Sequence, residues 1–338
     1  MAQKTPAKTL FIRLSQREPF PRHQKSAIER NLRLFAGDGW CLPEIVYVGI
    51  SGKWSYLMSY FWCVTHAAPA WPQTRSGGFA TPERRLIFDI NDLDETLPAP
   101  WEWDVKRLVA SFVLAARSNG LSDANGRDAA VACARSYRRK MRDFAAMDVL
   151  DVWYARLDDS DFLAMLPQAR KAVAMKRIAK ATARGSSELV FPKLVEQAGG
   201  QSRIHDTPPT IFHGEASRAA GNMDLIRQTL AKYRETLAED RRVLFDRYRL
   251  VDAAVKVVGI GSVGTLCGVA LMMSVADTPL FLQVKEANAS VLEAYAGKSV
   301  YTQHGERVVQ GQKLMQPASD LFLGWAIGPE GRHFYIRQ

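Results

Sequence analysis

A run of carboxylates follows a short apolar stretch in the first third of the sequence. The segment "RRLIFDINDLDETLPAPWEWD" contains Asp89, Asp92, Asp94 and Glu95, and Asp104 follows Asp92 by twelve residues. Carboxylates this close raise one another's pKa and destabilise a fold unless a cation or a proton lies among them. Mg²⁺ is a hard cation that binds one or two carboxylates together with phosphate oxygens. The cluster therefore predicts a magnesium site at the end of a strand.

A structural interpretation stays open for part of this cluster. Asp94 and Glu95 can begin a turn, and Asp104 falls in the first turn of an expected helix, whose positive end favours a carboxylate. This interpretation explains some of the acids but not Asp89 and Asp92 beside them.

Three glycines form a second candidate site in the last quarter of the chain. The stretch "VVGIGSVGT" places Gly259, Gly261 and Gly264 in GxGxxG spacing. Glycines let a backbone approach phosphates and direct its N–H groups at them. The spacing alone does not identify the fold, because dinucleotide-binding folds and kinase glycine loops both use it.

The residues after the glycines favour the kinase order of elements. A dinucleotide site needs a helix after the last glycine and an acid on the next strand, whereas "TLCGVALMM" is compatible with a strand and "LFLQVKEA" carries Lys285. In kinases a lysine at this place holds the nucleotide phosphates. Glu293, on the expected helix "NASVLEAYAG", is its candidate ion-pair partner. A glycine-rich hairpin with an ordinary exposed lysine is the remaining alternative.

Several helices and strands must position these residues. "RRLIFDI" predicts a strand, an apolar stripe predicts a helix over Trp101–Ser118 closed by "NG", and Ser122 or Asp123 caps a second helix to about Ala146. Further along, we expect helical residues over 161–184, a loop-rich region over 185–222, a helix over 223–248 and a strand-rich region from 255 to about 316.

Composition and charge narrow the class of protein. The 338 residues are 47% apolar and 24% charged, as in soluble globular proteins. The four cysteines are scattered without a CxxC pair, which indicates a reducing cytoplasm and gives no support for a disulfide framework or a zinc site. The first thirty residues lack an apolar core, so we expect no signal peptide.

The net charge of +10 raises the possibility of nucleic-acid binding, and one apolar run raises the possibility of a membrane span. Residues 1–80 carry most of the positive surplus, and a solvated basic tail explains it better than nucleic-acid binding, since no nucleic-acid motif accompanies it. The uncharged stretch 257–276 is long enough to span a bilayer. Its glycines and the strand-like run after it favour two buried strands instead.

Long motifs resemble a known family. The segments "ERRLIFDINDLDETLPAPWEWDVKRLVAS", "KVVGIGSVGT", "PLFLQVKEANASVLEAY", "VVQGQKLMQPASDLFLGW" and "FYIRQ" resemble the uncharacterised bacterial family called domain of unknown function 2252, from about Gly78 onward. The DINDxDE…WEWD stretch also resembles the aminoglycoside-phosphotransferase branch of kinase-like proteins. The second resemblance implies that Asp92 binds Mg²⁺, with Asp94 and Asp89 as further candidate ligands. It also implies that Asp104 is a scaffold residue that braces the loop.

The chain departs from the pattern of this family where the catalytic base is expected. Family members carry a GDxHxxNFG-like motif before the equivalent of "GFATPERR", and in kinase-like enzymes its Asp is the base and its Asn binds metal. Here no Asp, Glu or Asn occurs between Glu44 and Glu83, and His66 is no evident substitute. The family pattern also continues beyond "FYIRQ". We therefore expect a diverged amino-terminal segment, a truncated carboxyl terminus and no phosphoryl transfer.

These observations predict a kinase-like α+β fold in which the order of the lobes is permuted. Residues 1–78 form a basic, Trp-rich segment of undefined fold, 79–250 a mainly helical lobe with the acidic loop, and 251–338 a β-rich lobe with the glycine loop. We expect a cytoplasmic protein that binds ATP, Mg²⁺ and an unknown small-molecule acceptor, without nucleic-acid or membrane partners. The alternatives are a non-catalytic interaction protein or truncated remnant and, more weakly, an NADP-dependent oxidoreductase. The sequence does not predict the oligomeric state.

Overall fold

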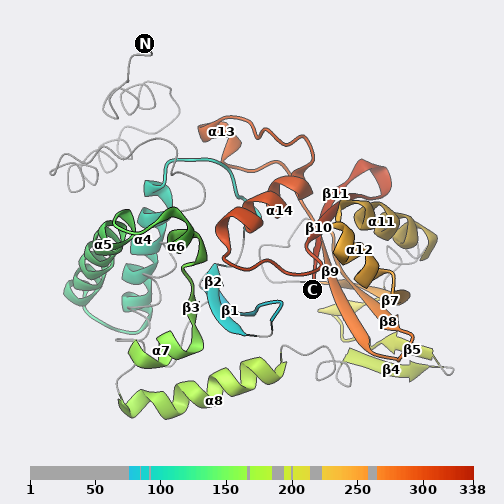
Figure 1. Ribbon diagram of the computed structural model, residues 1–338, viewed down its shortest axis with the longest axis horizontal. Helices are drawn as coiled ribbons and strands as arrows, with labels where there is room; N and C mark the ends of the chain where they lie inside the picture. The colour runs from blue at the N-terminus through green and yellow to red at the C-terminus, as the bar shows by residue number, and fades with distance from the viewer. Residues whose placement is uncertain are drawn as a thin grey trace. The chain divides into compact units, whose positions relative to one another are not determined.

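The protein is described by a computed structural model at residues 76–83, 85–90, 93–165, 168–184, 194–198, 201–213, 223–257 and 265–338. All of these residues belong to one compact unit, Tyr47–Gln338. They form helices and antiparallel sheets (Figure 1), which confirms a mixed α+β fold. Residues 1–75, which include His66 and nearly all of the expected Trp-rich segment, lie outside the described residues.

The first part of the described chain combines a small sheet with helices. The strands β1 (Ser76–Ala80), β2 (Leu86–Ile90) and β3 (Leu157–Asp158) form an antiparallel sheet in this order. The helices are α4 (Glu102–Ser118), α5 (Asp123–Ala145), α6 (Val149–Tyr154), α7 (Asp159–Met165) and α8 (Gln168–Arg184). The expected strand "RRLIFDI" is therefore present as β2, directly before the acidic residues.

Helices α4 and α5 form a hairpin whose ends follow from local sequence signals. Gly120 adopts a positive φ of 70° after α4, and the hydroxyl of Ser122 accepts a hydrogen bond from Asn125 N at 3.2 Å to cap α5. The two helices pack through buried apolar side chains, which include Phe112 and Cys133. The helix boundaries predicted at Trp101–Ser118 and from Ser122 to about Ala146 are confirmed within a residue or two.

The carboxyl-terminal part contains a six-stranded antiparallel sheet in the order β10-β11-β9-β8-β7-β6. Its strands are β6 (Ile211–Phe212), β7 (Tyr248–Lys256), β8 (Cys267–Ser274), β9 (Pro279–Glu286), β10 (Gly324–Ile327) and β11 (His333–Arg337). A separate hairpin consists of β4 (Val195–Ala198) and β5 (Gln201–Ile204). The helical segments are α11 (Met223–Thr236), α12 (Glu239–Phe245), α13 (Glu293–Ala296), α14 (His304–Met315) and the 3₁₀ turn η4 (Pro329–Gly331).

The two faces of this sheet bury different clusters of side chains. On one face, α11 and α12 pack against alternate strand residues, which include Met272, Leu282 and Ile336. On the opposite face, here called the α14 face, Val308 and Val309 of α14 pack against Tyr335. Because side chains alternate along a strand, Lys285 lies on the α14 face, directly opposite Tyr335 in the register of β9 and β11.

The expected loop-rich region and the expected single helix after it differ from the structure. Strands β4, β5 and β6 lie within residues 185–222, although the predicted breaker "DTPPT" does form the turn between β5 and β6. The expected helix over 223–248 is divided into α11 and α12. At the end of α11, the hydroxyl of Thr236 lies 2.7 Å from Tyr233 O and accepts a hydrogen bond of 3.1 Å from Trp325 N of β10.

The strand-rich assignment of residues 255–316 is wrong for α14. This helix contains Gly305 and Gly311, which lower helix propensity and conceal the helix in the sequence. Both are needed for close packing: a Cβ atom at Gly305 would lie 2.1 Å from Phe334 O, and one at Gly311 would lie 2.2 Å from Thr96 Cγ2. The helix therefore approaches β11 and the acidic loop more closely than a side chain would permit.

Residues 257–276 show the expected strand rather than a membrane helix where they are described. β8 begins at Cys267 and pairs with β7 and β9 on either side. Within the described parts of the chain, none of the helices has the length and apolar character needed to cross a membrane.

Candidate functional site

The acidic segment leaves β2 and turns at Leu93–Thr96. Asp89 lies in β2 opposite Gly77, and Asp92 falls outside the described residues. A hydrogen bond of 3.0 Å from Thr96 N to Leu93 O closes the turn. Asp94 and Glu95 therefore occupy a tight turn, as the structural interpretation of the sequence expected.

Arg307 of α14 holds this turn in place. Its guanidinium donates to Thr96 O at 2.6 Å, to Asp94 O at 2.7 Å and to Asn288 O at 3.0 Å. The residue is 3% exposed, and burial lowers its pKa, while the charges of Glu95 and its neighbours oppose that shift. One buried cation thus joins the acidic turn to α14 and to the loop after β9.

Glu95 adds a second anchor between the same segments. Its carboxylate accepts a hydrogen bond from Val291 N at 2.8 Å, and its backbone carbonyl accepts one from Ser290 Oγ at 3.0 Å. These bonds commit Glu95 to fixing the loop that precedes α13. Its Oε2 therefore acts as a structural acceptor.

Asp94 is the acidic side chain that enters a pocket with Lys285. The hydroxyl of Tyr335 donates a short hydrogen bond to Asp94 Oδ1, and Lys285 Nζ lies 5.6 Å from the centroid of the Tyr335 ring. Burial, with a further contribution from Asp94, raises the pKa of Tyr335, so its hydroxyl remains a donor. One carboxylate oxygen of Asp94 is thus held by Tyr335, and Oδ2 has no hydrogen bond among the residues the structure describes.

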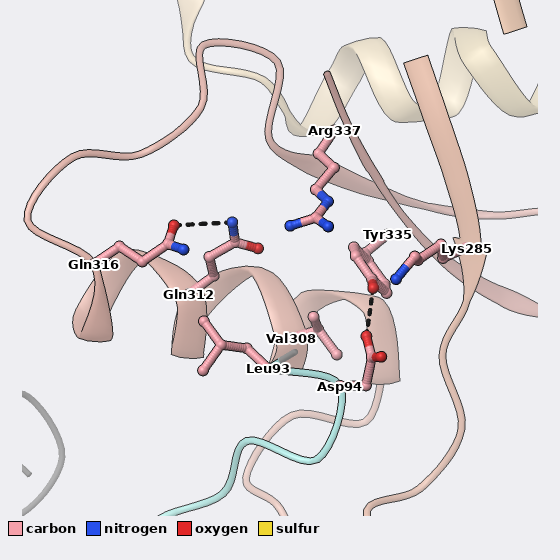
Figure 2. A pocket seen from close by; sticks show the side chains of 8 residues that line it. All are labelled: Leu93, Asp94, Lys285, Val308, Gln312, Gln316, Tyr335 and Arg337. Atoms are coloured by element: carbon pink, nitrogen blue, oxygen red, sulfur yellow. Dashed lines mark hydrogen bonds between the residues drawn. The ribbon is translucent and has the colours of Figure 1, made fainter. Parts of the chain in front are cut away.

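The pocket is small, polar and partly open to solvent. Figure 2 shows Asp94, Tyr335 and Lys285 on one side and Arg337 facing the amides of α14 on the other. The lining residues are Leu93, Asp94, Lys285, Val308, Gln312, Gln316, Tyr335 and Arg337. Two cations, Lys285 and Arg337, and one carboxylate, Asp94, therefore line this pocket.

Lys256 lies close to this pocket on the α14 face. Val255 pairs with Gly268 and Cys267 pairs with Lys285, so Lys256, Cys267 and Lys285 form a row across β7, β8 and β9. Burial lowers the pKa of Lys256, and the charge of Lys285 lowers it further. Neither lysine forms an ion pair with a carboxylate of the described residues. Two half-buried cations that repel each other favour an anion between them.

The structure brings together some of the expected site residues but not all. Asp94 and Lys285 line one pocket, Asp104 lies exposed in the first turn of α4, and Arg307 donates hydrogen bonds to the acidic turn. Glu293 forms no ion pair with Lys285. Its charge acts on Arg307, and its Oε1 is buried with no hydrogen-bond partner. The expected pairing of these two residues is therefore not observed.

The glycines lie outside the described residues, but their place in the chain is defined. Gly259, Gly261 and Gly264 connect Lys256, the last residue of β7, to the start of β8. These strands are antiparallel neighbours. The chain therefore has the order strand, glycine segment, strand and lysine-bearing strand that was expected.

The fit of the acidic residues to Mg²⁺ is partial within the described part of the chain. That part holds no group of three or more His, Cys, Asp or Glu side chains placed to bind a metal ion. A carboxylate such as Asp94 can bind Mg²⁺ together with phosphate oxygens and water, since this ion needs only one or two carboxylates from a protein. Asp92 and the side chain of Asp89, the other candidates, are not described.

Several contributors to the site were not expected from the sequence, among them Arg307, Tyr335, Arg337, Gln312 and Lys256. Tyr335 and Arg337 fall within "FYIRQ", and Gln312 falls within "VVQGQKLMQ", two of the motifs that carry the family resemblance. Their chemistry depends on contacts between distant segments, so residue type and spacing alone did not reveal it.

The fold and the pocket define a mixed α+β protein with a polar, cation-rich site on one face of an antiparallel sheet. The chain belongs to the bacterial family described as "Uncharacterized protein conserved in bacteria (DUF2252)", whose model matches residues 76–338. This confirms the family expected from the motifs. No curated protein and no solved structure matches the chain.

Proposed function

We propose that this chain is a kinase-like, cytoplasmic nucleotide-binding protein that holds MgATP between Lys285 and the acidic segment Asp89–Glu95. One observation carries the proposal: Asp94 and Lys285, which lie far apart in the sequence, line the same pocket. In kinase-like sites a lysine contacts the nucleotide phosphates and carboxylates bind the metal between them. A lysine and a carboxylate in one pocket are the two residue types that such an arrangement needs, and this supports the proposal.

Lys256 and the glycine segment support the same proposal. Lys256 and Lys285 lie in one row without carboxylate partners among the described residues. The segment with Gly259, Gly261 and Gly264 follows Lys256 in the sequence. Glycine N–H groups and two ammonium groups together suit several phosphates in a chain. The metal would be held by Asp94 and Asp92, with Asp89 as a further ligand.

For the family, the proposed activity is phosphoryl transfer to a small-molecule acceptor. For this chain, the proposal is that MgATP binds without being turned over. The Asp and Asn that would serve as base and metal ligand in a kinase-like catalytic loop are not found in the sequence. Without a base to accept the proton of the acceptor hydroxyl, catalysis falls by about 10²–10⁴-fold. MgATP is therefore expected to bind and to remain intact.

Calorimetry with MgATP tests the proposal directly. Wild type should bind with measurable heat, and Lys285→Met should lose at least about tenfold in affinity, because a charge-assisted contact to phosphate contributes 1.5–3 kcal/mol. Lys313→Met is the matched control, since Lys313 lies exposed on α14. Equal MgATP affinity in wild type and Lys285→Met, or no heat in wild type, would contradict nucleotide binding at this pocket.

A non-catalytic interaction protein is the second candidate, and the hydrogen bonds of Glu95 favour it. Glu95 and the backbone of Asp94 fix the turn to the loop after β9 and to α14, so part of the acidic cluster already has a structural role. On this view Asp94→Asn changes stability and nothing else. The NADP-dependent alternative needs a helix after Gly264, where the chain enters β8 instead.

A further inference from the structure

Arg337 is a positively charged residue of the pocket. Neither the sequence motifs nor the proposed nucleotide site assigns it a role. It ends β11 opposite Gln283 of β9, two residues from Lys285. Figure 2 shows its guanidinium pointing into the pocket toward Gln312. Its Nε is buried and has no hydrogen-bond partner. A buried guanidinium donor without an acceptor is destabilising, so this group is suited to an acceptor supplied by a ligand.

The carboxylates near Arg337 accept hydrogen bonds from donors other than Arg337. Asp320 accepts hydrogen bonds from the backbone N–H groups of Phe322 and Gln338, and Asp94 accepts one from Tyr335. Arg337 forms no ion pair with either. Its charge therefore acts on them only through space and remains without a direct counter-ion among the described residues.

The wall that faces Arg337 is polar but neutral. Gln312 Nε2 donates to Gln316 Oε1 at 2.9 Å, and both side chains are buried on α14. This bond fixes the orientation of the Gln312 amide. A structural ion pair with Arg337 would need a carboxylate where Gln312 lies. Because Gln312 is a neutral amide, the positive charge of Arg337 stays available to a ligand.

From this arrangement we propose that Arg337 forms an oxyanion-binding subsite that takes the phosphate or carboxylate group of a second small-molecule ligand. The planar guanidinium matches two oxygens of such a group. Gln312 and Gln316 form the opposite wall, and Lys285 lies at the end nearest the proposed nucleotide phosphates. The subsite stands independently of nucleotide binding, because the residues that form its two walls, Arg337 and Gln312, are not those assigned to MgATP.

In the experiment, the full chain is titrated with inorganic phosphate. The NMR signal of the Arg337 Nε–Hε group is recorded at each phosphate concentration. Arg337→Lys identifies this signal by its loss from the spectrum. Saturable movement of the signal with phosphate, absent with chloride at equal ionic strength, is the expected result. No saturable movement with phosphate, and none in a parallel titration with acetate, would overturn the proposal. A response to phosphate alone assigns a phosphate ester, and a response to acetate alone assigns a carboxylate.

Two variants separate this subsite from the nucleotide site. Gln312→Glu places a carboxylate opposite Arg337 and should reduce phosphate affinity at least about tenfold. Arg332→Met is the control, because Arg332 is an exposed arginine directly after η4, and this variant should leave phosphate affinity unchanged. Lys285→Met should weaken MgATP binding and retain the Arg337 response within about threefold. Loss of the phosphate response in Lys285→Met but not in Gln312→Glu would place the anion at Lys285 and overturn the proposal. Failure of wild type to bind MgATP, with the Arg337 response intact, would remove only the proposed function.

Discussion

The hydroxyl of Tyr335 donates a hydrogen bond to the carboxylate of Asp94, and this contact joins the last strand of the sheet to the acidic turn after β2. Lys285 lies opposite Tyr335 on β9, with its ammonium group over the tyrosine ring. One tyrosine therefore orients the candidate metal ligand and lies beside the candidate phosphate ligand. The geometry of the pocket depends on it.

The first prediction concerns the energy of this contact. Tyr335→Phe, Asp94→Ala and the double variant form a double-mutant cycle, in which we expect a coupling free energy of about 1–2 kcal/mol, because a hydrogen bond to a charged acceptor is lost. Urea denaturation measures the free energy of unfolding of each protein. Tyr248→Phe replaces Tyr335→Phe in the control cycle and should show no coupling with Asp94→Ala. Equal coupling in both cycles would show that the contact is not specific.

The second prediction concerns Arg307. Arg307→Met leaves three backbone carbonyls without their donor and the neighbouring acids without a counter-charge, so the free energy of unfolding should fall by about 3 kcal/mol or more. Arg307→Lys should recover only part of this, since an ammonium group does not reproduce the planar fork.

Arg332→Met is the matched control for Arg307. Arg332 is exposed and pairs with the exposed Glu330 and, at 3.5 Å, with the mostly buried Glu286, so its loss should cost no more than about 1 kcal/mol. Thermal and urea unfolding distinguish the two arginines. Similar losses in Arg307→Met and Arg332→Met would argue against a buried anchor for the acidic turn.

The third prediction contrasts two helical glycines. In Gly311→Ala a Cβ atom would lie 2.2 Å from Thr96 Cγ2, and we expect destabilisation by about 1–3 kcal/mol from overpacking. In Gly126→Ala the nearest atom would lie 3.5 Å away, so the gain in helix propensity should stabilise by about 0.5–1 kcal/mol. Opposite signs in the measured free energies of unfolding are the expected result. A neutral Gly311→Ala would mean that α14 and the acidic turn do not pack closely.

The hairpin α4–α5 was predictable because its signals are local. Ser122 and Gly120 mark the two ends of the connection, and the apolar stripe that includes Phe112 lies on one helix face. Helix α14 was not predictable, because Gly305 and Gly311 look unfavourable until their tertiary neighbours are known. Helix propensity argued against a helix over α14, because close packing at the two glycines outweighs their low propensity.

The candidate site shows the same division between local and tertiary information. The clustering of like charges pointed to the acidic segment, and the VxK pattern after the glycines pointed to Lys285. The sequence did not show that Asp94 lies beside Tyr335, since that contact joins residues at opposite ends of the described chain. The sequence also did not show that the charge of Glu293 acts on Arg307, a buried residue of α14.

The final prediction concerns Lys256, whose pKa is lowered by burial and by the charge of Lys285. Because the unfolded chain retains the usual lysine pKa, unfolding takes up a proton between the lowered pKa and about 10.5. The free energy of unfolding should therefore rise with pH in that window, and Lys256→Met should remove this contribution.

The same variant should separate stability from binding. Lys256→Met removes a half-buried charge and its repulsion of Lys285, so the ligand-free protein should be more stable at pH 7 than wild type. If the two lysines bind phosphates, the affinity for MgATP should fall at least about fivefold in this variant. Lys313→Met, on the exposed side of α14, should change neither quantity. A variant that is less stable at pH 7 and binds MgATP as tightly as wild type would show that Lys256 stabilises the fold and contacts no anion.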